Sequence, residues 1–181
     1  MRVLGAIIAA AVIAAPFATP AAQAQAPAAT APAAVPEAMP FDIPYGTPIN
    51  LDQAYKAILA AAAEATKHNW KMSILVVDPA GNLVAHATMD GTQYASIEIS
   101  QAKARTSALY RRPSGVFQAA VNTGGSPSSL SLLALTRGAA SEGGFPVVVD
   151  GKLIGAIGAS GGIFTQDAVT AKAGLDALNA K

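Results

Sequence analysis

Apolar positions in the second part of the chain recur at helical spacing in some segments and form short continuous runs in others. The first helical stripe follows Asn50, which is a good N-cap, and Gln53 completes a capping box. We therefore expect a first helix over residues 51–68, whose apolar stripe consists of Leu51, Ala54, Tyr55, Ile58, Leu59, Ala62 and Ala65.

Two pairs of apolar, β-branched runs predict antiparallel hairpins. Trp70–Val77 and Leu83–Met89 are separated by the turn-forming residues DPAGN. Phe145–Val149 and Leu153–Ala159 are separated by the tight-turn dipeptide Asp150-Gly151. Each pair is expected to form two neighbouring strands of one sheet.

Further helices are expected between and after the hairpins. Ser96–Arg112 contains few helix breakers, and Thr165 is expected to cap a last helix that reaches about Leu178. The segment 113–127 predicts loops around a helical turn, and 130–135 fits either a strand or a helix. This order predicts an α/β fold of the α+β type, in which helices flank a central, mainly antiparallel sheet of about five strands in a single domain.

The first 48 residues differ from the rest. Residues 1–24 have the layout of a secretory signal peptide, because the apolar run Val3–Ala15 is too short to cross a bilayer and a small-x-small cleavage site follows it. Residues 25–48 form an Ala/Pro-rich leader that is expected to be disordered, although Phe41, Ile43 and Tyr45 alternate like a strand-like arm. The folded domain is expected at 49–181, in the periplasm or secreted.

Composition excludes several classes of protein. The 12 basic and 11 acidic residues leave no surplus for nucleic-acid binding, and the absence of cysteine excludes disulfides and thiolate metal sites. Hydrophobic residues make up 52% of the chain and charged residues 13%. An exported domain of this kind relies on apolar packing, and we expect it to be assisted by homo-oligomerisation.

Two catalytic motifs match but lack their context. Residues 158–162 fit G-x-S-x-G around Ser160, yet both histidines precede this serine, whereas α/β-hydrolases place the histidine after it. Ser100 and Lys103 fit S-x-x-K, but the partner motifs S-D-N and K-T-G are absent. No catalytic residue is therefore assigned.

Other residues are candidates for binding. His86, with Met89 three residues on, is a candidate ligand for a soft or borderline metal such as haem iron, whereas a satisfied strand histidine is the simpler interpretation. The glycines of GAIGASGG would admit a flat ligand, or the backbone of a packed helix or second subunit, and the following helix N-terminus could bind an anion. Glu98 and Arg105 share a helix face that is either a solvated ion-pair face or a site for an anionic ligand.

Three ordered blocks resemble the GlcG/HbpS-type family, which includes the C-terminal domain of PduO-type cobalamin adenosyltransferases. They are SILVVDPAGNLVAHATMDG, SIEISQAKARTSALYRRPS and GGFPVVVDGKLIGAIGASGG followed by QDAVTAKAGLDAL. The resemblance implies a helix-flanked antiparallel sheet, self-association and, in several members, haem binding. It places the binding neighbourhood at Met89, Asp90, Gly91, Lys103, Arg105, Ser160, Gly161 and Gly162.

With this resemblance, the sequence predicts an exported, oligomeric protein that binds haem or another tetrapyrrole. Lys103, Arg105 or the last helix N-terminus would contact the propionates, and His86 or Met89 the iron. The first alternative is an enzyme of small acids or of haem breakdown, with Asp90, Glu98 and Lys103 as acid–base groups. The second is a non-catalytic assembly or sensory partner. The residues favour a binding protein over an enzyme.

Overall fold

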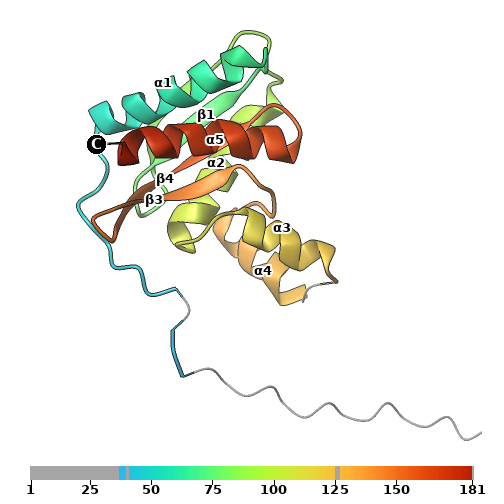
Figure 1. Ribbon diagram of the computed structural model, residues 1–181. Helices are drawn as coiled ribbons and strands as arrows, with labels where there is room; N and C mark the ends of the chain where they lie inside the picture. The colour runs from blue at the N-terminus through green and yellow to red at the C-terminus, as the bar shows by residue number, and fades with distance from the viewer. Residues whose placement is uncertain (1–36, 40, 125–126, 181) are drawn as a thin grey trace, which may run out of the picture. The chain divides into compact units, whose positions relative to one another are not determined.

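The computed structural model describes residues 37–39, 41–124 and 127–180 of the 181-residue chain (Figure 1). The expected signal peptide and most of the Ala/Pro-rich leader lie outside these residues. The compact unit begins at Ala38. Within the described residues, no helix is long and apolar enough to cross a membrane.

The described residues form five helices and four strands. Two hairpins alternate with the helices, as the sequence predicts. In chain order the elements are α1 (Leu51–Lys67), β1 (Ser73–Val77), β2 (Leu83–Thr88), α2 (Ala95–Leu109), α3 (Gly115–Asn122), α4 (Pro127–Thr136), β3 (Gly144–Val149), β4 (Lys152–Ser160) and α5 (Phe164–Asn179).

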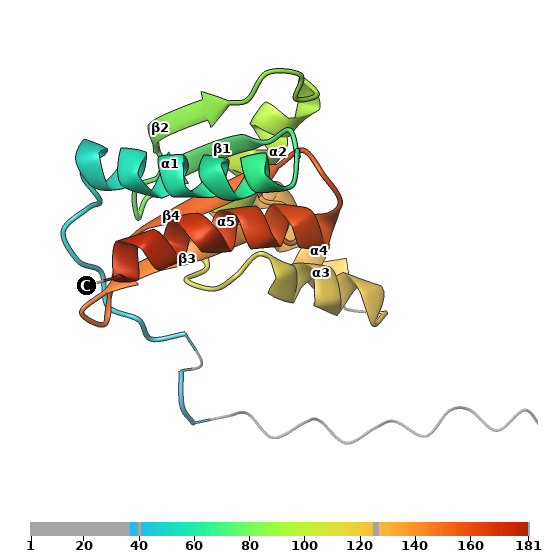
Figure 2. The ribbon, with the colours of Figure 1, turned by 45° about the horizontal axis from the view of Figure 1, so that its top comes forward.

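The strands form one sheet in the order β2-β1-β4-β3, and every neighbouring pair is antiparallel. Helices α1 and α5 cover one face, α2 covers the other, and α3 and α4 lie beyond α2 (Figures 1 and 2). This confirms the α+β fold class, with four strands in place of about five. The two hairpins lie side by side in the sheet and are joined at its centre, where β1 pairs with β4.

Some element boundaries differ from the sequence prediction. The predicted capping box of α1 is confirmed, since the Asn50 side chain accepts from the Gln53 amide and the Gln53 side chain from the Asn50 amide. Thr165 is wrong as the cap of α5: the N-cap is Ile163, two residues earlier, which has an extended backbone, and the helix begins at Phe164. The segment 113–127, where loops around a helical turn were expected, contains a complete helix, α3. The undecided segment 130–135 lies in α4.

The two faces of the sheet are packed differently. The face under α1 and α5 carries the larger apolar cluster, which includes Ile58, Met72, Ile74 and Ile157. The face under α2 carries a small cluster whose members are Leu75, Val77, Ala104, Ala108 and Ala156. Helix α2 therefore meets the sheet mainly through small residues.

Glycines in β3 and β4 allow this close contact. A β-carbon at Gly158 would overlap the Ser100 carbonyl oxygen and lie 2.7 Å from the Ala104 amide nitrogen. A β-carbon at Gly144 would likewise overlap the Lys103 carbonyl oxygen. The close approach of a packed helix, one of the two explanations for the glycine-rich strand, is thus the one seen here.

The strand-like arm, which the sequence offered as an exception to a disordered leader, lies on the domain. Tyr45 pairs in parallel with Leu153, and the Leu153 amide donates to the Pro44 carbonyl at 2.8 Å. The Arg112 guanidinium lies 3.9 Å from the centre of the Phe41 ring. The segment just after α2 and the start of β4 together hold the arm on the domain.

The two edges of the sheet are unlike. Edge strand β2 has the sequence LVAHAT, with neither proline nor charge, whereas edge strand β3 contains Pro146. Proline lacks an amide donor and so interrupts further strand pairing.

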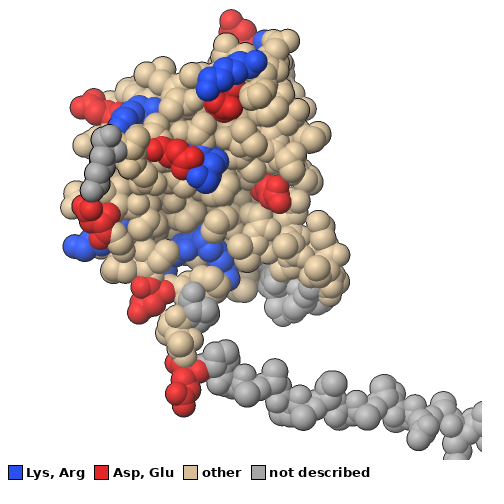
Figure 3. Space-filling model, in the orientation of Figure 1, with Lys and Arg blue, Asp and Glu red and all other residues tan. Residues whose placement is uncertain are grey.

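The surface seen in Figure 3 is largely uncharged, with single acidic and basic side chains in place of a patch of one sign.

Replacing Gly158 by alanine is expected to lower the free energy of unfolding by about 3 kcal/mol, because the methyl group meets backbone atoms that cannot move alone. Gly151→Ala is the control: its site is open, with φ +73°, so its cost is only that of the left-handed backbone, about 1 kcal/mol. Urea unfolding of both variants tests this. Equal costs would show that α2 can shift away from the sheet.

Candidate functional site

A chain of three hydroxyl groups and one imidazole links β2, β1 and α2 on the α2 face of the sheet. The Nε2 atom of His86 lies 2.9 Å from Thr88 Oγ1 and 3.0 Å from Ser73 Oγ. Ser73 Oγ lies 3.1 Å from Ser100 Oγ, which donates to the Ile97 carbonyl at 2.9 Å. Strand alternation and the register Leu75↔His86 put these side chains on one face.

The donors in this chain can be assigned by counting protons. Ser100 uses its only proton on the Ile97 carbonyl, so it accepts from Ser73. Ser73 then has no proton left and accepts from His86. His86 therefore carries its proton on Nε2, which also points at Thr88, and neutral His86 keeps its lone pair on Nδ1.

Met89 does not join His86. Met89 packs against the apolar cluster under α1 and α5, on the opposite face of the sheet. A spacing of three residues along a strand places side chains on opposite faces, so one iron cannot contact both. Asp90 and Gly91 continue into an exposed turn, where Gly91 has a φ of +79°.

Lys103 lies deep in the domain. Its Nζ is 2.6 Å from Asp167 Oδ2 of α5 and also donates to the Ala159 carbonyl at 3.2 Å, and the two side chains are 1% and 2% exposed. Burial lowers the pKa of Lys103 and raises that of Asp167, while their mutual attraction opposes both shifts. Lys103 thus ties α2 to β4 and α5 and is not free to contact a propionate.

The two amides just before α5 are occupied. The Gly162 amide donates to Asp167 Oδ1 and the Ile163 amide to Gln166 Oε1, both at 3.0 Å. Ser160 is 3% exposed and pairs with Ser73 across the sheet. The Gly161 and Gly162 loop is therefore closed by side chains of its own helix.

Neither catalytic motif is assembled. His86 contacts Ser73 and Thr88, not Ser160. Ser100 bonds to Ser73, whereas Lys103 bonds to Asp167. Among the described residues, no group of three His, Asp or Glu could hold a metal ion.

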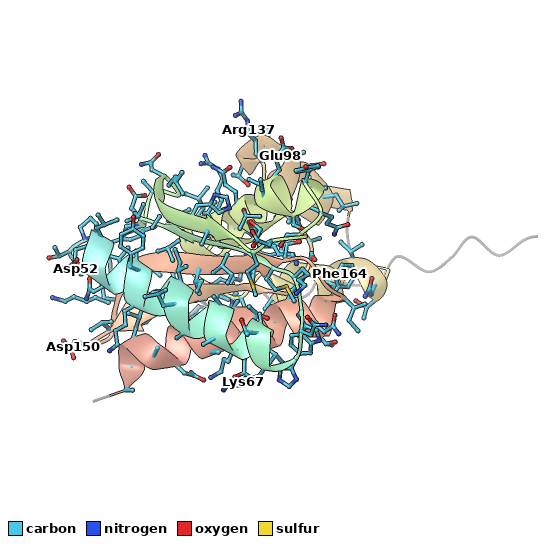
Figure 4. The ribbon with its side chains drawn as sticks, turned by 90° about the horizontal axis from the view of Figure 1, so that it is seen from above. Asp52, Lys67, Glu98, Arg137, Asp150 and Phe164 are labelled. Atoms are coloured by element: carbon cyan, nitrogen blue, oxygen red, sulfur yellow. The ribbon has the colours of Figure 1, made fainter. Side chains whose placement is uncertain are left out.

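A cleft of about 580 Å³ runs along the outer face of α2 and is closed by the segment after α4. We call it the α2 cleft. Its lining residues are Glu98, Ile99, Gln101, Ala102, Arg105, Arg137 and Ala139. Glu98 and Arg137 lie on the same side of the molecule (Figure 4).

The α2 cleft contains one of the predicted binding residues, Arg105, and one predicted acid–base residue, Glu98. Arg137 and Ala139 were missed, because they follow a segment whose structure the sequence left undecided. A smaller hollow of about 420 Å³, between the start of α1 and the β3–β4 turn, contains none of the predicted site residues.

The fold and this cleft define the class: an antiparallel α+β sandwich with a cleft of small-molecule size. Residues 49–176 match the family described as "Haem degrading protein HbpS-like". The chain belongs to this HbpS-like family, which confirms the resemblance noted in the sequence.

Individual relatives agree. Protein GlcG of Escherichia coli (strain K12) is 44% identical over 109 residues, which are 60% of this chain and 78% of GlcG. The crystal structure of Klebsiella pneumoniae protein ORFY has 29% identity and a TM-score of 0.70, covering 82% of this chain and 99% of that chain. The crystal structure of a PduOC–haem complex has 23% identity and a TM-score of 0.67, covering 72% and 95%, and shares the fold.

Breaking the buried ion pair from one side is expected to be costly. Lys103→Met leaves a buried carboxylate unpaired and should destabilise the domain by about 3–5 kcal/mol, as should Asp167→Asn for the lysine. The double variant K103M/D167N removes both charges and should cost clearly less than the sum of the two. Urea unfolding measures the cycle, and additive costs would contradict a coupled pair.

The hydroxyl–imidazole chain predicts the tautomer of His86. The chain has only two histidines, so their ¹⁵N signals in long-range correlation spectra can be assigned from His86→Gln and His68→Gln. We expect neutral His86 to be protonated at Nε2, and Ser73→Ala to weaken this preference because the acceptor is lost. A proton on Nδ1 in the unmodified protein would contradict the assignment.

Proposed function

We propose that this protein binds haem. The observation that carries the proposal is the match of residues 49–176 to the HbpS-like family, whose description names haem. A protein of the same fold has also been crystallised as a haem complex. Bound haem would supply an iron centre and a visible chromophore.

The α2 cleft offers contacts for the apolar ring and for the propionates of haem. Its volume is within the usual range for small-molecule sites, roughly 300–1,000 Å³. Ile99, Ala102 and Ala139 offer apolar contacts, and Arg105 and Arg137 offer positive charge for propionates. Lys103 and the amides of Gly162 and Ile163 are engaged elsewhere and are not assigned to this role.

His86 does not line the α2 cleft. It is kept as the candidate iron ligand from the sequence, separately from the cleft. Ligation through Nε2 would break its bonds to Ser73 and Thr88, so the free lone pair on Nδ1 is the atom that the geometry favours. Met89 lies on the other face and is not assigned.

Titration of the full chain with hemin tests the proposal. We expect saturable binding with a shifted Soret band, and a changed band position in His86→Ala but not in His68→Ala. His68 is a matched control because it is exposed at the end of α1, stacked on Trp70. An unshifted Soret band with folded protein would refute haem binding, whereas unchanged spectra in H86A would refute only the ligand.

Haem degradation is the second candidate, because the family description names it. The geometry does not favour it: Glu98 lies in the α2 cleft, Asp90 in an exposed turn, and Lys103 is buried with Asp167. Adding a reductant such as ascorbate to the hemin complex separates the two. A binding protein retains the Soret band, and a degrading enzyme loses it at a rate proportional to enzyme.

The proposed role is haem sensing, storage or transport outside the cytoplasm, after removal of residues 1–24. Self-association is part of the proposal, because α4 exposes Leu130, Leu132 and Leu135. The non-catalytic assembly or sensory partner stays a separate alternative to this role. Light scattering of the titration sample gives the mass of the assembly.

A further inference from the structure

The charges in the α2 cleft are unbalanced. Arg105 and Arg137 line it with a single acid, Glu98. No ion pair joins any of these three side chains to another described residue. The cleft thus holds two guanidinium groups without a carboxylate partner.

Arg105 is held in a fixed position by neutral acceptors. Its Nε donates to the Thr136 carbonyl at 2.9 Å and its Nη1 to the Gly81 carbonyl at 3.1 Å. These bonds use two of the five guanidinium protons and connect α2 to the β1–β2 turn and to the end of α4. The other three protons remain for a ligand, and the group is already oriented.

Arg137 occupies a backbone position that usually belongs to glycine. Its φ is +52°, and it stands directly after α4. The Arg137 amide donates to the Ala134 carbonyl at 3.3 Å, and the Gly138 amide donates to the Leu133 carbonyl at 2.7 Å. This is a Schellman cap, whose left-handed residue is commonly glycine. The left-handed backbone costs an arginine more than it would cost a glycine. The cap bonds are made by main-chain atoms, so they do not explain why an arginine stands here.

Arg111 is the useful comparison, because it has a φ of +54° in the same position after α2. Its guanidinium donates to the Ile43 carbonyl at 3.0 Å and lies over the Tyr45 ring. The side chain of Arg111 therefore has a role in holding the arm. The side chain of Arg137 has no such bond among the described residues, and it is exposed at the cleft.

We propose that the α2 cleft is a carboxylate-binding site in which Arg137 and Arg105 bind two carboxylates carried on an apolar body. This proposal deepens the proposed haem function. It rests on that function only for the identity of the molecule that carries the carboxylates. Haem propionates and a free dicarboxylic acid share this chemistry. Glu98 opposes both and limits the affinity.

The first experiment compares hemin with hemin dimethyl ester, using the full chain. We expect hemin to bind at least tenfold more tightly than the ester, and Arg137→Gln to weaken hemin by about tenfold while leaving the ester unchanged. Lys56→Gln, an exposed charge change on α1, should alter neither. Equal affinity for hemin and ester, with no effect of R137Q, would overturn the proposal while haem binding stands.

A second variant separates binding from stability. Arg137→Gly relieves the left-handed backbone, so it should leave Tm equal or raise it while weakening hemin as much as R137Q does. A lowered Tm would show that Arg137 has a structural role and would count against a ligand site. Glu98→Gln should tighten hemin several-fold, and weaker binding would contradict the role given to Glu98.

If hemin does not bind at all, the proposed function fails and the site is tested on its own. Glutarate titrated into ¹⁵N-labelled protein should shift the amide signals of 137–139 and 98–105, and R137Q should abolish these shifts. Signals that do not move with glutarate would then overturn the carboxylate site as well.

Discussion

The contact between the α2 backbone and the glycines of β3 and β4 is the constraint on which the rest of the domain depends. With helix and sheet this close, α2 contributes mainly serines, alanines and the long, thin Lys103 to the layer between them, and the sheet contributes Leu75 and Val77. Ser100 is thereby brought within reach of Ser73, and Lys103 within reach of Asp167. A thin layer favours small residues, and on α2 several of these are serines, so the layer contains polar groups. Each buried polar group in it needs a specific partner.

One helix supplies groups for three different purposes because its period spreads neighbouring residues around its axis. Lys103 points into the sheet and binds Asp167, whereas Arg105 lies on the outside and lines the α2 cleft. Arg111 and Arg112, just past the helix end, hold the arm through a carbonyl and aromatic rings. Four cations within ten residues thus act in the core, at the cleft and on the arm, without repelling one another at one place.

The sequence was sufficient for the fold because strand runs and turn dipeptides mark the hairpins directly. It also placed the first helix and the arm. It could not resolve α4, where the leucines lack a clear period, and Arg137 was missed as a result. Spacing alone separates His86 from Met89 onto opposite faces, but only the register brings Ser73 beside His86. Whether Lys103 faces a ligand or a buried carboxylate depends on a residue 64 positions away.

The unlike edges of the sheet limit how copies of this domain could join by strand pairing. Pro146 interrupts β3, so β2 is the edge left with an unbroken run of backbone donors and acceptors. A molecule with one open edge can use it only once. Pairing through β2 would relate two copies by a two-fold axis and stop there, since neither has another edge to offer.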